Sequence, residues 1–102
     1  MRVLNKYKDE IPQGAINIMR PGFWGNPFSI GTDGNREEVL QKYRQWFDLM
    51  MQSPQKDVFI RALSKLSKAS ALVCCCNPAD CHGDILVEKM QEFGMLKDTE
   101  DG

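Results

Sequence analysis

Residues 70–90 have the sequence SALVCCCNPADCHGDILVEKM. The apolar run at residues 70–73 predicts a buried strand, and residues 84–90 predict a helix. The polar residues between them would follow the C-terminal end of a strand and precede the N-terminus of a helix. Open α/β sheets place their ligand sites at such positions. The stretch therefore predicts an α/β fold with a site at the carboxyl edge of its sheet.

All four cysteines and the single histidine of the chain lie within the nine residues from Cys74 to His82. No secretion signal follows Met1, and no apolar run approaches the roughly 20 residues that a bilayer requires. We therefore expect a cytoplasmic protein without a membrane association. In that compartment cysteines are thiols or ligands rather than structural disulfides.

Length and charge narrow the classes of protein further. A chain of 102 residues with 42% hydrophobic and 26% charged residues is typical of one soluble domain. We place this domain at residues 1–96 and expect residues 97–102 to be a disordered acidic tail. With 13 basic and 14 acidic residues the net charge is −1, so nucleic acid is not favoured as a partner.

The rest of the chain predicts the element order β-β-α-α-β-α. Strands are expected at residues 1–5 and 15–19, before a long loop at residues 20–34. The first helix should begin near Asn35, where Glu38 completes a capping box, and the second at Pro54. The apolar faces of the three helices are Val39, Leu40, Tyr43, Trp46, Phe47 and Met50; Phe59, Ala62, Leu63 and Leu66; and Ile85, Leu86, Met90 and Phe93. The order predicts a small single-domain α/β sandwich with helices packed on a sheet that is at least partly parallel.

The long loop begins with RPGFWGNPF at residues 20–28. The guanidinium of Arg20 is a planar fork suited to phosphate or carboxylate. Trp24 could stack on a base or sugar. Asn26 could contact an amide or base edge, or hold the loop through its own backbone. In the structural alternative, Trp24 and Phe28 plug one end of the core.

Two motifs in this order resemble those of one bacterial and phage family, catalogued as domain of unknown function 4326. They are the RPGFWGNPF segment and the C-x-C-x4-C-H-G-D segment that begins at Cys74, with the helix containing Tyr43 between them. The similarity spans roughly residues 16–86. In the position of Cys75 the family often has an aromatic residue. Because the family is named for lacking a known function, the resemblance implies a fold and a site but no reaction.

The cysteine-rich strand predicts different roles for its thiols. Alternation places Cys74 and Cys76 on one face and Cys75 on the other. Cys74 and Cys75 are expected to be buried small hydrophobes, whereas Cys76 should face the crevice at the end of the strand. The positive end of the next helix should lower the pKa of the Cys81 thiol and disfavour protonation of His82. Asp84 should cap that helix.

The favoured function is a small-molecule pocket for a nucleotide-like or phosphorylated ligand at the carboxyl edge of the sheet, with no cofactor. The anion would be held by Arg20 and the backbone of residues 81–83. The ligand-binding residues would be Arg20, Trp24, Asn26, Cys81, Gly83 and Asp84. Cys76 and His82 are the candidate catalytic residues, for nucleophilic or acid–base chemistry. The sequence leaves open whether the site is enzymatic.

Two alternatives belong to other functional classes. A structural zinc site would use Cys74, Cys76, Cys81 and His82, although C-x-C-x4-C-H is not the usual zinc-knuckle spacing. A non-catalytic phage or bacterial factor could instead bind a host protein through the loop around Phe23 and Trp24, whose aromatic rings would then be exposed.

Overall fold

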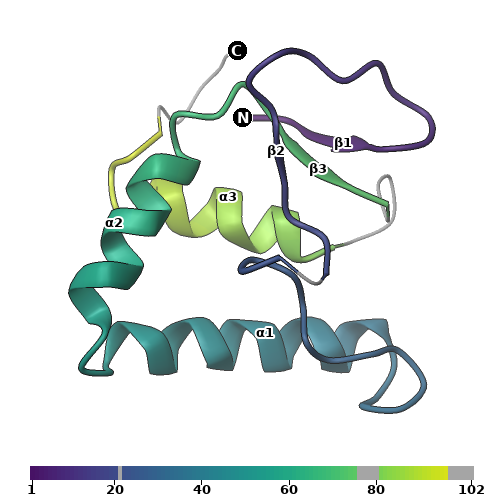
Figure 1. Cartoon of the computed structure of the whole chain (residues 1–102). Helices are drawn as coiled ribbons and strands as arrows, with labels where there is room; N and C mark the ends of the chain where they lie inside the picture. The colour runs from purple at the N-terminus through teal and green to yellow at the C-terminus, as the bar shows by residue number, and fades with distance from the viewer. Residues whose placement is uncertain (21, 76–80, 97–102) are drawn as a thin grey trace.

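The computed structural model describes residues 1–20, 22–75 and 81–96. It has the element order expected from the sequence (Figure 1). The elements are β1 (Val3–Asn5), β2 (Ile16–Asn17), α1 (Arg36–Met51), α2 (Lys56–Leu66), β3 (Leu72–Cys74) and α3 (His82–Glu92). The predicted small α/β fold is therefore confirmed. The tail expected at residues 97–102 lies outside the described residues, and the domain bounds stay a prediction.

The sheet has β3 at its centre, with β1 and β2 on either side. Both outer strands run parallel to β3, so Val3 and Ile16 flank Leu72 from opposite sides. A parallel pair needs a crossover connection, and α1 with α2 supplies the one from β2 to β3. Because all three strands run in the same direction, their C-terminal ends meet at one edge of the sheet. The segments that follow β2 and β3 therefore start close together.

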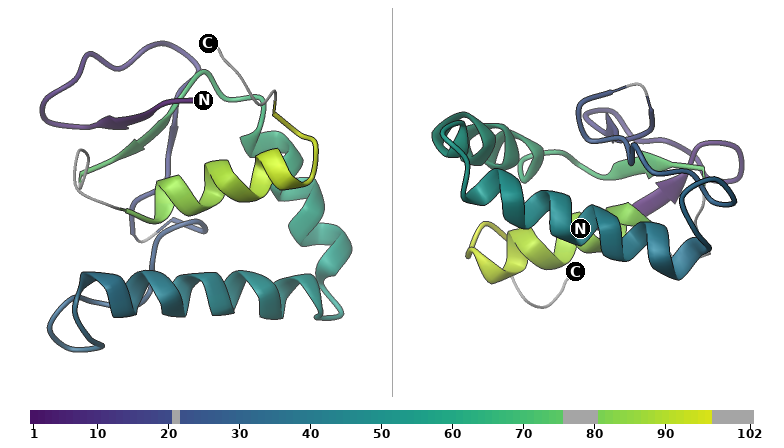
Figure 2. Two further views of the ribbon diagram at one scale, coloured as in Figure 1. Left: turned by 180° about the vertical axis from the view of Figure 1, so that it is seen from behind. Right: turned by 90° about the horizontal axis from the view of Figure 1, so that it is seen from below.

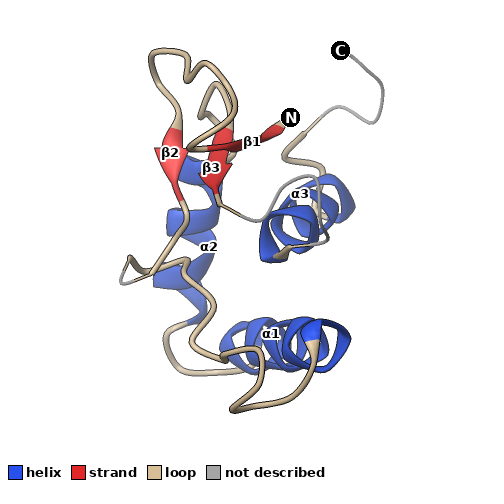
Figure 3. Cartoon of the chain, turned by 90° about the vertical axis from the view of Figure 1, so that its right-hand side faces the viewer, coloured by secondary structure: helices blue, strands red, loops and turns tan. Residues whose placement is uncertain are grey.

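The helices lie to one side of this small sheet. Figure 1 and the left view of Figure 2 show α3 between α1 and the strands, while α2 rises from the end of α1 toward the sheet. In Figure 3 the strands occupy one end of the molecule and α1 the other. Within the described residues, no helix has the length and apolar character that would let it cross a membrane.

The apolar helix faces predicted from the sequence form the core. The buried members are Val39, Tyr43 and Phe47 of α1, Phe59, Leu63 and Leu66 of α2, and Ile85, Leu86 and Met90 of α3. All of them except Val39 pack with the strand residues Leu72 and Cys74 into one cluster. Phe93, which follows α3, stays 44% exposed although its ring stacks on Phe47 at a centroid distance of 6.2 Å.

The start of α1 was predicted correctly. Asn35 is its N-cap, and the Asn35 side chain accepts a hydrogen bond from the Glu38 N–H at 2.8 Å. Glu38 Oε1 accepts from the Asn35 N–H at 2.8 Å, which completes the capping box. The first turn of α1 therefore directly follows the loop at residues 20–34.

The starts of the other two helices differ from the prediction. Pro54 lies in a turn, and α2 begins at Lys56 after an N-cap, Gln55, whose side chain makes no capping bond. Ser53 shapes this turn, because its hydroxyl donates to the Met50 carbonyl and accepts from the Gln55 N–H. The helix α3 begins two residues earlier than expected.

Candidate functional site

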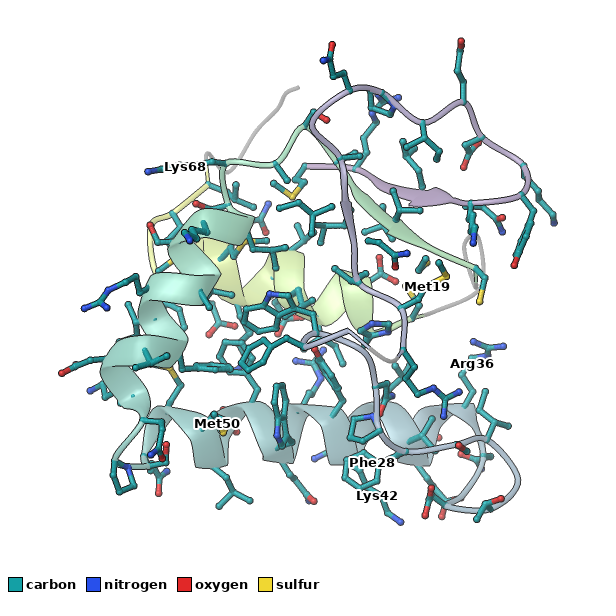
Figure 4. The ribbon with its side chains drawn as sticks, in the orientation of Figure 1. Met19, Phe28, Arg36, Lys42, Met50 and Lys68 are labelled. Carbon is teal, nitrogen blue, oxygen red and sulfur yellow. The ribbon has the colours of Figure 1, made fainter. Side chains whose placement is uncertain are left out.

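A cavity of about 290 Å³ opens where β2 and β3 end and where α1 and α3 begin. Four of the predicted ligand-binding or catalytic residues line it: Arg20, Asn26, Cys81 and His82. The two motifs, which are far apart in the sequence, therefore share one site, as the parallel sheet predicted. Figure 4 labels three further lining residues, Met19, Phe28 and Arg36, which lie together on one side of the molecule.

Arg20 follows β2 and reaches the cavity from the start of the long loop. Its Nη1 donates to Ser29 Oγ at 2.7 Å, which ties the beginning of the loop to its middle. Gly25 permits this closed shape, because a Cβ there would lie 2.7 Å from the Arg20 backbone nitrogen. One bond to Ser29 leaves most of the five guanidinium N–H groups of Arg20 for other partners.

Arg36 is a second guanidinium at the same cavity, and it was not among the predicted site residues. It is the first residue of α1, directly after the N-cap Asn35. A signal for it existed in the sequence. The predicted capping box ends the loop that Arg20 begins, so both ends of this loop could have been placed at one site.

His82 is a buried imidazole, 7% exposed, at the first residue of α3. Its Nε2 lies 2.7 Å from the carbonyl oxygen of Ile18, just after β2. Because a carbonyl can only accept, Nε2 carries the proton and Nδ1 of the neutral ring is an acceptor. Burial lowers the pKa of His82, and the nearby Arg20 lowers this pKa further. Protonation is disfavoured as predicted, but burial is the main cause.

Cys74 and Cys81 form a close pair of thiols that are not joined by a disulfide bond. Their Sγ atoms are 3.4 Å apart, and both side chains are buried. Cys81 is the N-cap of α3, and its Sγ accepts from the Gly83 N–H at 3.3 Å. The hydrogen bond with Cys74 and then burial raise the pKa of Cys81 far above that of an ordinary thiol. The expectation of a lowered pKa at Cys81 was therefore wrong.

Cys75 is exposed, which corrects the expectation that it is buried. The strand β3 ends at Cys74, so the alternation of a strand no longer applies to the next residue. Cys75 nevertheless lines the cavity, together with Cys74 and Cys81. Cys76, the predicted catalytic thiol, lies outside the described residues.

Trp24 does not line the cavity and instead belongs to the core. It is 7% exposed, its ring lies 5.3 Å from that of Phe59, and its carbonyl accepts from the Tyr43 hydroxyl at 2.8 Å. The core-plug interpretation of Trp24 is thus confirmed. Phe28 is only half-buried and does line the cavity. The neighbouring Phe23 is 57% exposed. Of the two aromatic rings expected at a protein-binding surface, Phe23 and Trp24, only that of Phe23 is therefore exposed.

Asn26 holds the loop through hydrogen bonds to the backbone, which is the second of its two predicted roles. Its Oδ1 accepts from the Phe28 N–H at 2.9 Å, and its Nδ2 donates to the carbonyl of Val39 in α1 at 3.4 Å. These two bonds fasten the loop to α1. Asn26 therefore shapes the wall of the cavity that it lines.

Gly83 and Asp84 do not line the cavity, and both have structural partners. A Cβ on Gly83 would lie 2.9 Å from Val3 Cγ1 and 3.0 Å from Ile18 Cδ1. The missing side chain therefore lets α3 approach the strands. Asp84 Oδ2 accepts from the Cys81 N–H at 3.2 Å, which confirms a capping role. The two backbone donors, at Cys81 and Gly83, are used within the first turn of α3.

The zinc interpretation depends on a residue that the structure does not describe. Within residues 1–20, 22–75 and 81–96, no three His, Cys, Asp or Glu side chains are placed to hold a metal ion. The set Cys74, Cys76, Cys81 and His82 would need Cys76. It would also need His82 to bind through Nδ1, because Nε2 donates to Ile18. A zinc site stays a prediction.

Comparison with known proteins places the chain in a family. An uncharacterised 12.4 kDa protein of the nrdA–td intergenic region of Enterobacteria phage T4 is 35% identical over 86 residues, which is 83% of this chain and 72% of the phage protein. No solved structure matches the chain. The model of the family described as "Domain of unknown function (DUF4326)" matches residues 2–92. The chain therefore belongs to the DUF4326 family, as its two motifs indicated.

Proposed function

We propose that the cavity binds a small phosphorylated or nucleotide-like anion. One observation carries this proposal. Arg20 and Arg36 line the cavity from two different segments, and none of the described residues that line it is acidic. The whole chain has a net charge of −1, so the two guanidinium groups at this cavity are not a consequence of a basic chain. Guanidinium groups suit phosphate because their planar N–H donors bind two oxygens at once.

The remaining walls of the cavity indicate the size and character of the ligand. Phe28, Ile30 and Leu40 give it an apolar side, against which a base or another flat group could pack. Ligand pockets usually have volumes of about 300–1,000 Å³, so this one is at the small end of the range. A monophosphate of a nucleoside or a sugar suits this volume better than a dinucleotide.

The proposal is for binding, and it assigns no reaction. His82 is a neutral imidazole at the cavity, which is the form that a general base requires. Cys81 is a buried, protonated thiol, so it is not set up as a nucleophile. The other predicted catalytic residue, Cys76, lies outside the described residues.

Calorimetric titration with a panel of ligands tests the proposal. Inorganic phosphate, ribose 5-phosphate and nucleoside 5′-monophosphates should bind, and the unphosphorylated nucleosides should bind much more weakly. Arg20→Ala and Arg36→Ala should each weaken binding roughly tenfold or more, because a hydrogen bond to a charged group contributes about 1.5–3 kcal/mol. Arg61→Ala is the matched control, since Arg61 is exposed on α2 and does not line the cavity.

Three results would contradict the proposal. The first is that no phosphorylated compound binds at millimolar concentration. The second is that nucleosides bind as tightly as their monophosphates. The third is that the Arg20 and Arg36 variants retain the affinity of Arg61→Ala. Thermal unfolding of each variant checks that a lost affinity does not reflect a lost fold.

A further inference from the structure

The close thiol pair at the cavity wall has a chemistry that anion binding does not use. Cys74 is the last residue of β3 and Cys81 is the N-cap of α3, so two elements of the core hold the two sulfur atoms in place. The Sγ–Sγ distance of 3.4 Å exceeds the length of a disulfide bond by only about 1.4 Å. Rotation of the side chains can close such a gap without moving the elements.

We propose that Cys74 and Cys81 are a redox-modification site that forms a reversible disulfide by exchange with a low-molecular-weight disulfide such as glutathione disulfide. The thiolate of one cysteine attacks a sulfur of the small disulfide, forms a mixed disulfide and releases one small thiol. The thiolate of the other cysteine then attacks the protein sulfur of that mixed disulfide and releases the second small thiol. Two protein thiols are oxidised, one small disulfide is reduced, and the two thiol protons end on the two released thiols.

The position of the pair explains how a reagent reaches it although the side chains are buried. Both cysteines line the cavity, so a small disulfide can approach from that side. The raised pKa of Cys81 keeps its thiolate scarce near neutral pH. The exchange should therefore be slow at pH 7 and should accelerate as the pH rises.

The disulfide would change the first turn of α3. Cys81 Sγ accepts the Gly83 N–H in the reduced protein, so it satisfies one of the free donors at the start of this helix. In the disulfide the same sulfur is bonded to the end of β3. Oxidation would thus fasten α3 to the sheet at the wall of the cavity. This consequence does not depend on which ligand the cavity binds.

The test uses the variant Cys75→Ser/Cys76→Ser, in which Cys74 and Cys81 are the only thiols. In a glutathione redox buffer its intact mass should fall by two hydrogens, without a glutathione adduct. The disulfide should form with an equilibrium constant roughly tenfold or more above that of the same chain in guanidinium chloride, because the fold holds the thiols together. The reciprocal variant Cys74→Ser/Cys81→Ser is the control. Its folding should not raise the equilibrium constant for disulfide formation.

The wild-type protein gives a second measurement that needs no substitution. Cleavage before aspartate separates residues 57–79, which contain Cys74, from residues 80–83, which contain Cys81. After oxidation the two peptides should be joined, and fragmentation should place the bond at Cys74. A bond at Cys75 or Cys76, adducts alone, or no advantage of the folded state over the denatured one would overturn the proposal.

Discussion

At the scale of single residues, His82 shows how the fold sets the charge of a buried side chain. Its Nε2 donates to the Ile18 carbonyl, so the hydrogen bond is compatible with a neutral ring. Burial lowers its pKa, and Arg20, which lines the same cavity, acts in the same direction. These two effects outweigh the Ile18 carbonyl and Asp84, which favour the charged ring. The result is a neutral imidazole, with an acceptor at Nδ1, at a cavity that the Arg20 guanidinium also lines.

The lowered pKa of His82 can be measured directly. His82 is the single histidine of the chain, so its ring signals in a proton NMR titration need no assignment. The midpoint should lie below the ordinary histidine value of about 6.5. A midpoint at or above that value would contradict the neutral, buried ring described here. A midpoint above about 7 would also mean that Nδ1 is mostly protonated at neutral pH.

The same shift fixes the sign of the pH dependence of stability. Since the folded-state pKa is below the unfolded one, the unfolded chain binds more protons as the pH falls through about 6.5. The contribution of His82 to the free energy of unfolding is therefore complete above that pH and is lost below it. The variant His82→Gln should show a flatter change in urea midpoint between neutral and mildly acidic pH. Arg44 lowers the pKa of Glu88 through a hydrogen bond, so Glu88 changes the stability only at more acidic pH.

At the scale of elements, helix starts were predictable where the capping residues follow the usual preferences. Asn35 with Glu38 is such a case. Cys81 is not, because cysteine is not among the residues that favour the N-cap position. Its thiol nevertheless accepts from the Gly83 N–H, two residues along the chain, and also lies against the Cys74 thiol. Pro54 was assigned by a rule for the first helical position, but the hydrogen bonds of Ser53 prolong the turn.

The two caps of α1 and α2 provide a matched pair of substitutions. Asn35→Ala removes the side chain that accepts from the Glu38 N–H, keeps the backbone N–H that donates to Glu38, and should cost about 1 kcal/mol of unfolding free energy. Gln55→Ala removes a cap residue that makes no side-chain bond and should change stability little. Urea denaturation of both variants measures the difference. Equal effects would show that the capping box does not stabilise α1.

At the scale of the whole molecule, the sequence predicted where the cavity lies better than which side chains line it. Parallel strands end at one edge, so Arg20 after β2 and His82 after β3 had to approach each other. Which side chains face the cavity depends on packing that no local pattern encodes. For Arg36 the capping box at Asn35 indicated only that this end of the loop lies near the site, and not that the Arg36 side chain lines the cavity. For Trp24 only the structural alternative, a ring that plugs the core, was correct. Whether this ring is buried depends on helices that are distant from it in the sequence.

Trp24 also shows what holds the site-forming loop to the helices. Its ring lies 5.3 Å from that of Phe59 in α2 and 6.5 Å from that of Trp46 in α1, so one side chain joins three segments. Trp24→Ala should cost about 3–5 kcal/mol, a large part of the stability of a domain of this size. Phe23→Ala is the control: its ring lies edge-on to Trp24 but is 57% exposed, so less is lost. Urea denaturation gives both values, and Trp24→Phe should be intermediate if Trp24→Ala does not fold. Equal costs for the Trp24 and Phe23 variants would mean that the loop is held by other contacts, and that the cavity wall does not depend on this ring.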